Sequence, residues 1–305
     1  MPEDRTQPES FRTGFVAIVG RPNVGKSTLL NRLLGEKVAI VSEKPQTTRN
    51  LIRGILTRDD FQVVFIDTPG IHQARDEINR YMVRQAVSTF QAVDLVLFLV
   101  EPSIAVGKDD EALGRRLKEV DAPVLLVINK IDRLGLTGRQ AALRACMRAF
   151  PGMRVFPVSA LKGEGVEGLL AQVVSLLPEG EMRFPPDEFT DQPVRFLCAE
   201  LIRERVFHLT GEEVPYSVAV EVVSFQESER DSKALVHVEA NLHVERPSQK
   251  GILIGSGGQM LKRIGTEARM RMESLLGAKV MLKLWVKVTR GWKNDPKSLR
   301  WLGYR

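Results

Sequence analysis

Short apolar runs alternate with helix-type apolar spacing along the first 180 residues. The runs predict buried strands at 15–19, 51–57, 61–66, 94–100, 124–128 and 155–158. Apolar residues spaced for one helical face predict helices at 28–34, 78–90, 109–120, 139–150 and 166–177. Strands that alternate with helices in this order predict an α/β fold with a doubly wound, mainly parallel sheet.

A different order of elements follows a proline-rich, acidic stretch at 179–193. The pattern predicts a helix at 194–209, strands at 217–225 and 236–244, a glycine turn between helices, a helix at 259–276 and a strand at 280–288. In the strand 236–244 apolar and polar residues alternate, which is typical of a half-buried strand. This order indicates a second domain of α+β type.

Composition and charge narrow the classes of function that this chain could have. The chain has 305 residues and a net charge of +6, and its longest strongly apolar run, at 95–100, is far too short to span a bilayer. The polar start is not expected to be a signal peptide, and we expect Cys146 and Cys198 to be reduced thiols. Residues 246–305 carry 14 basic and three acidic side chains. This block favours a polyanionic partner, although a solvated charged surface would have the same composition.

A glycine-rich loop lies between the first predicted strand and the first predicted helix. Residues 20–27 match the phosphate-loop pattern G-x-x-x-x-G-K-[ST]. Gly20 and Gly25 let backbone N–H groups turn toward phosphate, and the following helix directs the positive end of its dipole to the same point. The Lys26 ammonium can reach the β- and γ-phosphates, and the Ser27 hydroxyl can bind Mg²⁺. The loop therefore predicts a nucleotide site rather than a chance glycine turn.

Two further motifs end predicted strands of the same sheet. In the D-x-x-G motif at 67–70, Asp67 can hold Mg²⁺ through water and Gly70 lets a backbone N–H approach the γ-phosphate. The N-K-x-D motif at 129–132 ends in Asp132, whose carboxylate can accept from the ring N–H and the exocyclic amine of guanine. Adenine offers no such donor pair and would leave the carboxylate unpaired. These motifs predict that the nucleotide is GTP.

A second glycine turn lies inside the basic block. Residues 255–258 form a G-x-x-G turn, where small residues let a nucleic-acid backbone approach closely. Bases could lie along the adjoining apolar groove, with Ile252 and Ile254 as candidate walls. The charge and the element order favour the RNA clamp of KH domains over a plain helix hairpin. His237 and His243 are interpreted as sheet residues. The tryptophans are interpreted as packing residues: Trp285, Trp292 and Trp301.

Together these motifs resemble the Era GTPases over nearly the whole chain. The resemblance also rests on Gln46-Thr47-Thr48-Arg49, on Ser159-Ala160-Leu161 and on the terminal segment through Gly291-Trp292. It implies a P-loop GTPase domain and a type II KH domain. We therefore expect a disordered leader (1–13), the GTPase domain (14–178), a linker (179–193), the KH domain (194–291) and a C-terminal tail (292–305).

The family resemblance also implies a function. Era-like proteins are cytoplasmic bacterial enzymes that hydrolyse GTP with Mg²⁺, bind the 3′ end of 16S ribosomal RNA and assist maturation of the 30S subunit. Family members also associate with the inner face of the plasma membrane. We expect the chain to be a monomer that takes GTP and GDP. GTP and Mg²⁺ would order residues 38–50, which the pattern predicts to be a mobile loop, and so alter how the KH domain presents its groove.

The resemblance assigns site residues by position. The nucleotide-binding residues are expected to be Gly20, Arg21, Pro22, Asn23, Val24, Gly25, Lys26, Ser27, Thr28, Asp67, Thr68, Pro69, Gly70, Ile71, Asn129, Lys130, Asp132, Ser159 and Ala160. The expected catalytic residues are Lys26, Thr48, Asp67 and Gly70, and the expected Mg²⁺ ligands are Ser27, Thr48 and Asp67, with Thr47 less favoured than Thr48. The expected RNA-binding residues are Lys250, Ile252, Ile254, Gly255, Ser256, Gly257, Gly258, Lys262 and Arg263.

Four positions qualify this assignment. Ile71 stands where Ras-like enzymes carry a glutamine that orients water, so intrinsic hydrolysis should be slow. Asn23 resembles an asparagine that related enzymes use to hold K⁺, which makes K⁺ a second candidate cofactor. Ser256 and Gly257 place no basic side chain inside the G-x-x-G turn, so RNA affinity should depend more on the lysines and arginine around it.

Two other functions remain open at this point. The chain could be a nucleotide-gated RNA-binding scaffold in which hydrolysis is incidental, or an enzyme that uses ATP. Release of RNA or 30S subunits before and after hydrolysis distinguishes a switch from a scaffold. The response of nucleotide binding to a change at Asp132 distinguishes a GTP site from an ATP site.

Overall fold

The structure, a computed structural model, describes residues 11–42, 44–71, 76–90, 92–103, 105–230 and 233–304. The chain divides into two compact units. The N-terminal unit covers residues 1–39, 48–73 and 82–191. The C-terminal unit covers residues 192–305 and also takes in segments 40–47 and 74–81 from the first part of the chain.

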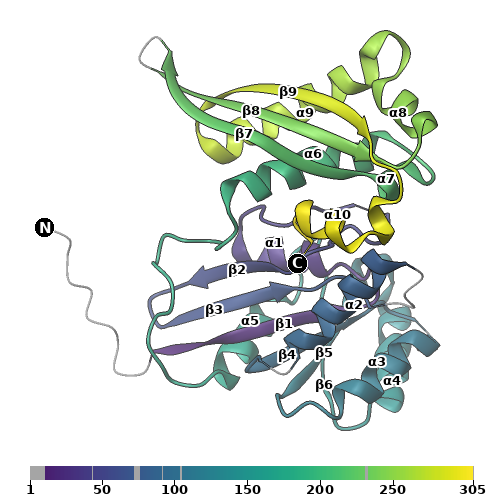
Figure 1. Ribbon diagram of the computed structural model, residues 1–305. Helices are drawn as coiled ribbons and strands as arrows, with labels where there is room; N and C mark the ends of the chain where they lie inside the picture. The colour runs from purple at the N-terminus through teal and green to yellow at the C-terminus, as the bar shows by residue number, and fades with distance from the viewer. Residues whose placement is uncertain are drawn as a thin grey trace, which may run out of the picture. The chain divides into compact units, whose positions relative to one another are not determined.

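The N-terminal unit is built on a six-stranded sheet with the strand order β2-β3-β1-β4-β5-β6 (Figure 1). β2 runs antiparallel to β3, and the other neighbouring pairs are parallel, as the alternation of strands and helices predicts. The fully buried strands are mostly continuous apolar runs because helices cover both faces of such a sheet. The strands are β1 (Arg12–Gly20), β2 (Ile52–Thr57), β3 (Phe61–Asp67), β4 (Leu95–Val100), β5 (Val124–Ile128) and β6 (Arg154–Pro157).

Helices connect these strands and bury their apolar faces. The helices are α1 (Lys26–Leu34), α2 (Glu77–Thr89), α3 (Lys108–Leu117), α4 (Leu136–Ala149) and α5 (Val166–Leu176), with a short 3₁₀ helix, η1 (Ile131–Arg133). α3, α4 and Phe90, which follows α2, share one core with alternate residues of β1, β4 and β5. In that core the rings of Phe98 and Phe150 pack edge to face with centroids 5.2 Å apart. The five α-helices were expected, with ends displaced by at most three residues, whereas η1 was not.

The first strand begins earlier than the sequence pattern suggested. Residues 1–10 of the expected leader lie outside the described residues, but Phe11 is buried and β1 starts at Arg12. The backbone N–H of Arg12 donates to Asp60, and the carbonyl of Phe11 accepts from Gly180. The burial of the Phe11 side chain and these two backbone hydrogen bonds account for the early start of β1.

The stretch expected to be a linker is bonded to the sheet. The Gln62 side chain donates to the carbonyl of Phe184 at 2.8 Å and accepts from the backbone of Arg183 and Phe184. The backbone N–H of Ile55 on β2 donates to Phe189 at 2.9 Å. The boundary between the two units then falls directly after Asp191.

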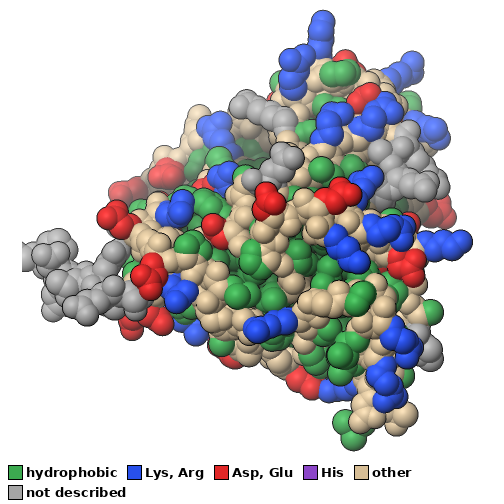
Figure 2. All heavy atoms as spheres, turned by 90° about the horizontal axis from the view of Figure 1, so that it is seen from below, with side chains coloured by type: hydrophobic (Ala, Val, Ile, Leu, Met, Phe, Trp, Pro, Cys, Tyr) green, Lys and Arg blue, Asp and Glu red, His purple; other side chains and the backbone are tan. Residues whose placement is uncertain are grey.

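Charge is mixed on the face seen from below in Figure 2, where basic and acidic side chains are interspersed among apolar ones.

Both cysteines, Cys146 and Cys198, are free and buried, and burial raises the pKa of each thiol to about 11. Within the described ranges, every helix is too short or too polar to cross a bilayer.

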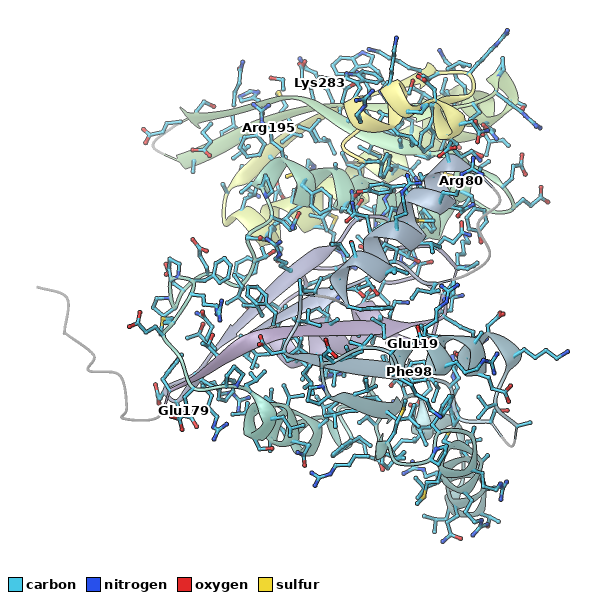
Figure 3. The ribbon with its side chains drawn as sticks, turned by 60° about the horizontal axis from the view of Figure 1, so that its bottom comes forward. Arg80, Phe98, Glu119, Glu179, Arg195 and Lys283 are labelled. Atoms are coloured by element: carbon cyan, nitrogen blue, oxygen red, sulfur yellow. The ribbon has the colours of Figure 1, made fainter. Side chains whose placement is uncertain are left out.

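The C-terminal unit is built on a three-stranded sheet with three longer helices, α6, α8 and α9, on one face (Figure 1). β7 and β8 are antiparallel, whereas β8 and β9 are parallel. Their inward-facing residues form one core with α6, α8 and α9. On the opposite face Lys283 of β9 (Figure 3) pairs with Glu239 of β8 at 3.3 Å. The elements are α6 (Val194–Leu209), α7 (Val214–Ser217), β7 (Ala219–Arg230), β8 (Lys233–Val244), α8 (Pro247–Ile254), η2 (Ser256–Gly258), α9 (Gln259–Leu276) and β9 (Lys279–Val288).

The last residues add a second, smaller core. η3 (Trp292–Asn294) and α10 (Pro296–Trp301) follow β9, where the sequence pattern indicated no element. Trp292 is fully buried, stacks on Tyr304 with ring centroids 5.9 Å apart and donates its indole N–H to the carbonyl of Ser217 at 3.1 Å. Trp292 is therefore a packing residue.

Replacing Trp292 with alanine tests this core. We expect Trp292→Ala to lower the free energy of unfolding of the C-terminal unit by about 3–5 kcal/mol, because it empties a closed site. Trp285→Ala removes the same side chain from a position that is 43% exposed and should cost about 1 kcal/mol or less. Urea unfolding followed by circular dichroism measures both. Equal destabilisation by the two variants would contradict the packing assignment.

Candidate functional site

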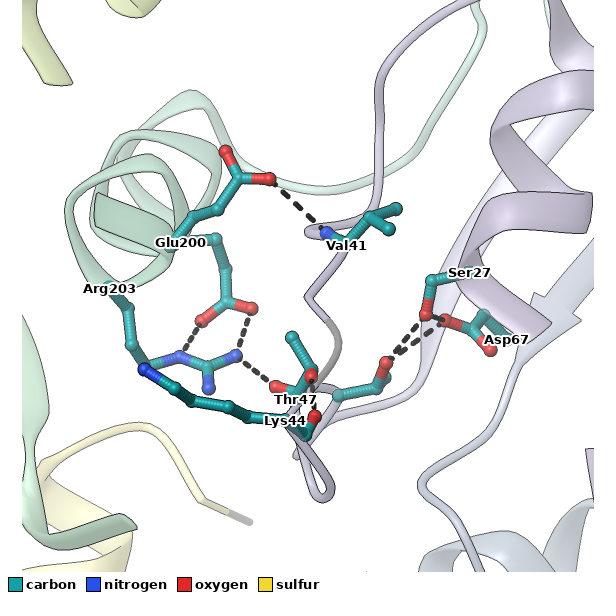
Figure 4. Close-up of polar contacts among 9 residues, drawn as sticks. Ser27, Val41, Lys44, Thr47, Asp67, Glu200 and Arg203 are labelled. Atoms are coloured by element: carbon teal, nitrogen blue, oxygen red, sulfur yellow. Dashed lines mark hydrogen bonds and ion pairs between the residues drawn. The ribbon is translucent and has the colours of Figure 1, made fainter. Parts of the chain in front are cut away.

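Three oxygen-bearing side chains meet in the N-terminal unit. Ser27 lies in the first turn of α1, Thr48 precedes β2 and Asp67 ends β3. The Ser27 hydroxyl donates to Asp67 Oδ2 at 2.6 Å (Figure 4). The Thr48 hydroxyl lies 2.8 Å from Ser27 Oγ and 3.1 Å from Asp67 Oδ2. The structure thus brings together the three residues expected to hold Mg²⁺, and Thr47 is not among them.

The chemistry of this cluster fits a divalent cation. The Asp67 carboxylate is fully buried, and its Oδ1 atom has no hydrogen-bond partner among the described residues. Burial raises the pKa of Asp67 to about 6, while Lys26 and the two hydroxyls oppose that rise. A cation beside the carboxylate would favour its ionised form. All three side chains offer oxygen, which is the ligand atom that Mg²⁺ prefers.

The phosphate loop has the conformation that its glycines allow. Gly25 has a φ of 98°, and a Cβ there would lie 2.3 Å from the Asn129 amide nitrogen. The Lys26 ammonium donates to the carbonyls of Gly20 at 3.1 Å and Arg21 at 3.0 Å. Burial lowers the pKa of Lys26 to about 8, and Asp67 opposes that shift. Because the buried Lys26 ammonium is poorly hydrated, an anionic ligand would strongly stabilise its charged form.

Asn129 ties the phosphate loop to the two loops expected to read the base. Its amide nitrogen donates to the carbonyl of Val24 at 2.8 Å, and its amide oxygen accepts from the backbone N–H of Ala160 at 2.9 Å. The side chain is buried, with 2% of the residue exposed. Because both ends of the amide are bonded, its orientation is fixed.

Asp132 is held in the form that can accept two hydrogen bonds. The Ser159 hydroxyl donates to Asp132 Oδ1 at 2.6 Å, and this bond keeps the pKa of the carboxyl below its usual value. From α1, the Arg32 guanidinium donates to the carbonyls of Ala160 and Leu161. No sequence motif identifies Arg32, because its partners are backbone atoms far along the chain.

Two cationic residues of the expected site have acidic partners that the motifs do not include. The Lys130 ammonium pairs with Glu101 and donates to the carbonyl of Asn23. Arg21 pairs with the buried carboxylate of Asp110 at 2.7 Å. These partners lie in loops and helices outside the motif patterns, so spacing could not identify them.

The remaining expected residues surround the same loops. The Thr68 hydroxyl donates to the carbonyl of Ile18 at 2.8 Å. A Cβ at Gly70 would lie 2.7 Å from Pro22, so the two loops approach closely. Ile71 packs against the core that β1, β4 and β5 share with α3 and α4. Thr28 is half-buried in α1, and Pro69 follows Thr68 in the loop after β3.

The glycine turn of the C-terminal unit lies between α8 and α9. Gly255, Gly257 and Gly258 have φ angles of 71°, 56° and 80°. A Cβ on Gly255 would lie 2.7 Å from the Cβ of Met260, whereas the space around Gly257 and Gly258 is open. Ser256 is exposed between them. The turn therefore presents backbone to solvent, as close approach by a phosphate chain requires.

A groove of about 400 Å³ runs from this turn along α9 and β9. Lys262 and Arg269 supply its positive charge. Ile252 and Ile254, the walls expected from sequence, belong to α8 and lie outside the lining, because Ile254 packs into the core and Ile252 is exposed. Lys250 also lies in α8, and Arg263 pairs with Glu267 at 2.9 Å. The lining residues are Gly258, Leu261, Lys262, Gly265, Thr266, Arg269, Leu282 and Leu284.

Comparison with known families gives one match for each unit. Residues 15–130 match the model of a 50S ribosome-binding GTPase family, and residues 213–293 match that of the KH domain. The GTPase named Era from Geobacter metallireducens is 52% identical over 297 residues, which are 96% of this chain and 98% of the relative. The GTPase Era from Alkaliphilus metalliredigens is 45% identical over 97% of this chain and 99% of its own length.

Two solved structures are similar over nearly the whole chain. One is a variant of Era from Aquifex aeolicus bound to GDP·AlF4⁻, with a TM-score of 0.93 and 39% identity over 96% of this chain and 99% of that one. The other is Era in complex with MgGDPNP and nucleotides 1506–1542 of 16S ribosomal RNA, with the same TM-score, identity and coverage.

Replacing Asp132 with asparagine tests the expected base contact. An amide offers one acceptor and turns a donor toward the guanine donors, so we expect Asp132→Asn to weaken GTP and GDP binding roughly a hundredfold, which is about 2.7 kcal/mol. Asp121→Asn makes the same change at an exposed carboxylate and should leave binding unchanged. Isothermal calorimetry with GTP, GDP and ATP measures all three affinities. Unchanged GTP affinity in the first variant would refute the contact.

Proposed function

Because the chain belongs to the Era family of GTPases, we propose that it is a GTP-hydrolysing switch that binds the 3′ end of 16S ribosomal RNA and assists maturation of the 30S ribosomal subunit. The observation that carries the nucleotide half of this proposal is the Asn129 amide, which joins a phosphate loop to a guanine-type loop. A relative captured with a 16S ribosomal RNA segment supports the RNA half.

The nucleotide chemistry follows from the residues described. Ser27, Thr48 and Asp67 would hold Mg²⁺, which when bound neutralises charge on the phosphate oxygens. The Lys26 ammonium and the loop N–H groups would bind the β- and γ-phosphates, and Asp132 would select guanine. Ile71 offers no group that could orient a water molecule, which supports slow intrinsic hydrolysis.

The C-terminal unit supplies the proposed RNA-binding site. The glycine turn would receive the sugar–phosphate chain, and bases would lie along the groove between α9 and β9, where Lys262 and Arg269 supply positive charge. The block of residues 246–305, with 14 basic and three acidic side chains, would attract RNA over a longer range.

The family resemblance adds finer features to the proposal. We include a cytoplasmic location with peripheral association with the inner face of the plasma membrane, and a monomeric chain. We also include K⁺ as a second cation beside Asn23, whose backbone has the unusual φ of 66° and whose carbonyl accepts from Lys130.

A single-turnover experiment distinguishes a switch from a scaffold. The protein is bound to 30S subunits with GTP or with a non-hydrolysable analogue, and release is followed after dilution. A switch should leave the subunit faster once GTP is hydrolysed, because the two nucleotide states differ in their contacts. Equal release with both nucleotides would favour the scaffold, in which hydrolysis is incidental.

A charge placed in the glycine turn tests the RNA site. We expect Ser256→Asp to weaken binding of a 16S ribosomal RNA 3′-end oligonucleotide at least tenfold in a gel shift, because the carboxylate repels phosphate, while GTP affinity stays unchanged. Ser256 suits this test better than Gly255, where a side chain would collide with Met260.

The matched control places the same charge far from the turn, near the end of the helix that follows it. Ser274 lies near the end of α9, 18 residues long and so about 27 Å from end to end. Ser274→Asp should leave RNA binding within about twofold of the unmodified protein. Equal weakening by both variants would mean that net charge, and not the turn, determines affinity.

A further inference from the structure

Segment 40–47 belongs to the compact C-terminal unit although it lies between α1 and β2 in sequence. The Val41 N–H donates to the Glu204 carboxylate at 3.2 Å, and the Val41 carbonyl lies 3.0 Å from the His208 ring nitrogen. The Lys44 ammonium donates to the carbonyls of Phe207 and Thr210. The segment is therefore bonded along the second half of α6.

The last of these contacts is made by a buried arginine. Arg203 Nη2 donates to the carbonyl oxygen of Thr47 at 2.6 Å (Figure 4). The same guanidinium donates to both carboxylate oxygens of Glu200 at 2.7 and 2.5 Å, in the two-pronged geometry that fixes its plane. Its centre also lies 5.4 Å from the ring centroid of Phe207. Arg203 is 2% exposed, so this hydrogen bond is shielded from water.

The bonded carbonyl belongs to the peptide that leads into Thr48. A peptide unit is planar, and it contains the carbonyl oxygen of one residue and the Cα atom of the next. A hydrogen bond to the Thr47 oxygen therefore restrains the Cα atom of Thr48, from which the hydroxyl bonded to Ser27 and Asp67 extends. The Thr47 side chain takes no part, because its hydroxyl donates to the carbonyl of Lys44 at 2.9 Å.

We propose that Arg203, oriented by Glu200, is a positioning residue for Thr48: it fixes the Thr47–Thr48 peptide so that the Thr48 hydroxyl is delivered to the Ser27–Asp67 oxygen cluster. This inference rests on the proposed function, in which that cluster holds Mg²⁺ with GTP. Among the described residues, the hydrogen bonds of Arg203 go to Glu200 and to the Thr47 carbonyl, and not to Ser27, Thr48 or Asp67. Its influence passes through one peptide bond.

The proposal predicts a specific loss. We expect Arg203→Lys, which keeps the charge but removes the planar fork, to raise the Mg²⁺ concentration needed for half-maximal binding of a non-hydrolysable GTP analogue about tenfold. Affinity for the analogue in EDTA should stay within about twofold. A fluorescently labelled analogue titrated with Mg²⁺ measures both quantities without any turnover.

A double-mutant cycle shows whether Arg203 acts through Thr48. If it does, Arg203→Lys should shift the Mg²⁺ requirement in the unmodified chain and have no further effect when Thr48→Ala is already present. An equal shift in both backgrounds would overturn the proposal. A Mg²⁺-independent affinity of the unmodified chain would instead refute the proposed nucleotide site, so the two failures can be told apart.

Arg205→Lys is the matched control. Arg205 lies on the same helix and is also buried, and among the described residues its ion pairs are with Glu204 and Glu267 and not with the Thr47 peptide. This variant should leave the Mg²⁺ requirement unchanged, and an equal shift would show a general effect of loosening α6.

A second variant serves if Arg203→Lys unfolds the C-terminal unit. Glu200→Gln keeps the guanidinium, weakens its restraint and should raise the Mg²⁺ requirement in the same way. A folded Glu200→Gln variant with an unchanged Mg²⁺ requirement would also overturn the proposal.

Discussion

The nucleotide site depends on the buried amide of Asn129. This side chain bonds the phosphate loop at Val24 and the last loop of the N-terminal unit at Ala160, which are far apart in sequence. Gly25 makes the contact possible, because any Cβ would occupy the place of the amide nitrogen. A buried amide with both ends bonded has one favourable orientation, so the spacing between phosphate and base loops is set before a nucleotide arrives.

Much of the fold could be predicted from the sequence, because its signals are local. The helix at 194–209 and the strand at 124–128 have the bounds that apolar periodicity predicts. The convergence of Ser27 and Asp67 follows from their motifs, since both lie at the carboxyl edge of a parallel sheet. α10 was missed because its six residues are too few for a periodic pattern. The partners of Arg21 and Lys130 were missed because long-range ion pairs have no fixed spacing.

The charged residues of α6 show the limit of such predictions most clearly. From sequence alone, charged residues on a helix are assigned to its solvent-exposed face. Four charged residues of α6 are nevertheless buried: Glu200, Arg203, Glu204 and Arg205. Burying a charge is costly unless it is paired, and these side chains pair with one another and with backbone groups of segment 40–47. On segment 40–47 the partners of these charges are backbone carbonyl and N–H groups. The side chains of the segment therefore do not indicate that α6 charges are buried against it.

The proline-rich stretch before α6 has a role beyond joining two units. β2 is the outermost strand of its sheet, and its free edge could pair with a strand of another molecule. The bond from Ile55 to Phe189 and the ion pair between Arg53 and Asp191 cover part of that edge. A shortened chain that ended before residue 183 would therefore be prone to self-association, so the GTPase half is best isolated with this stretch attached.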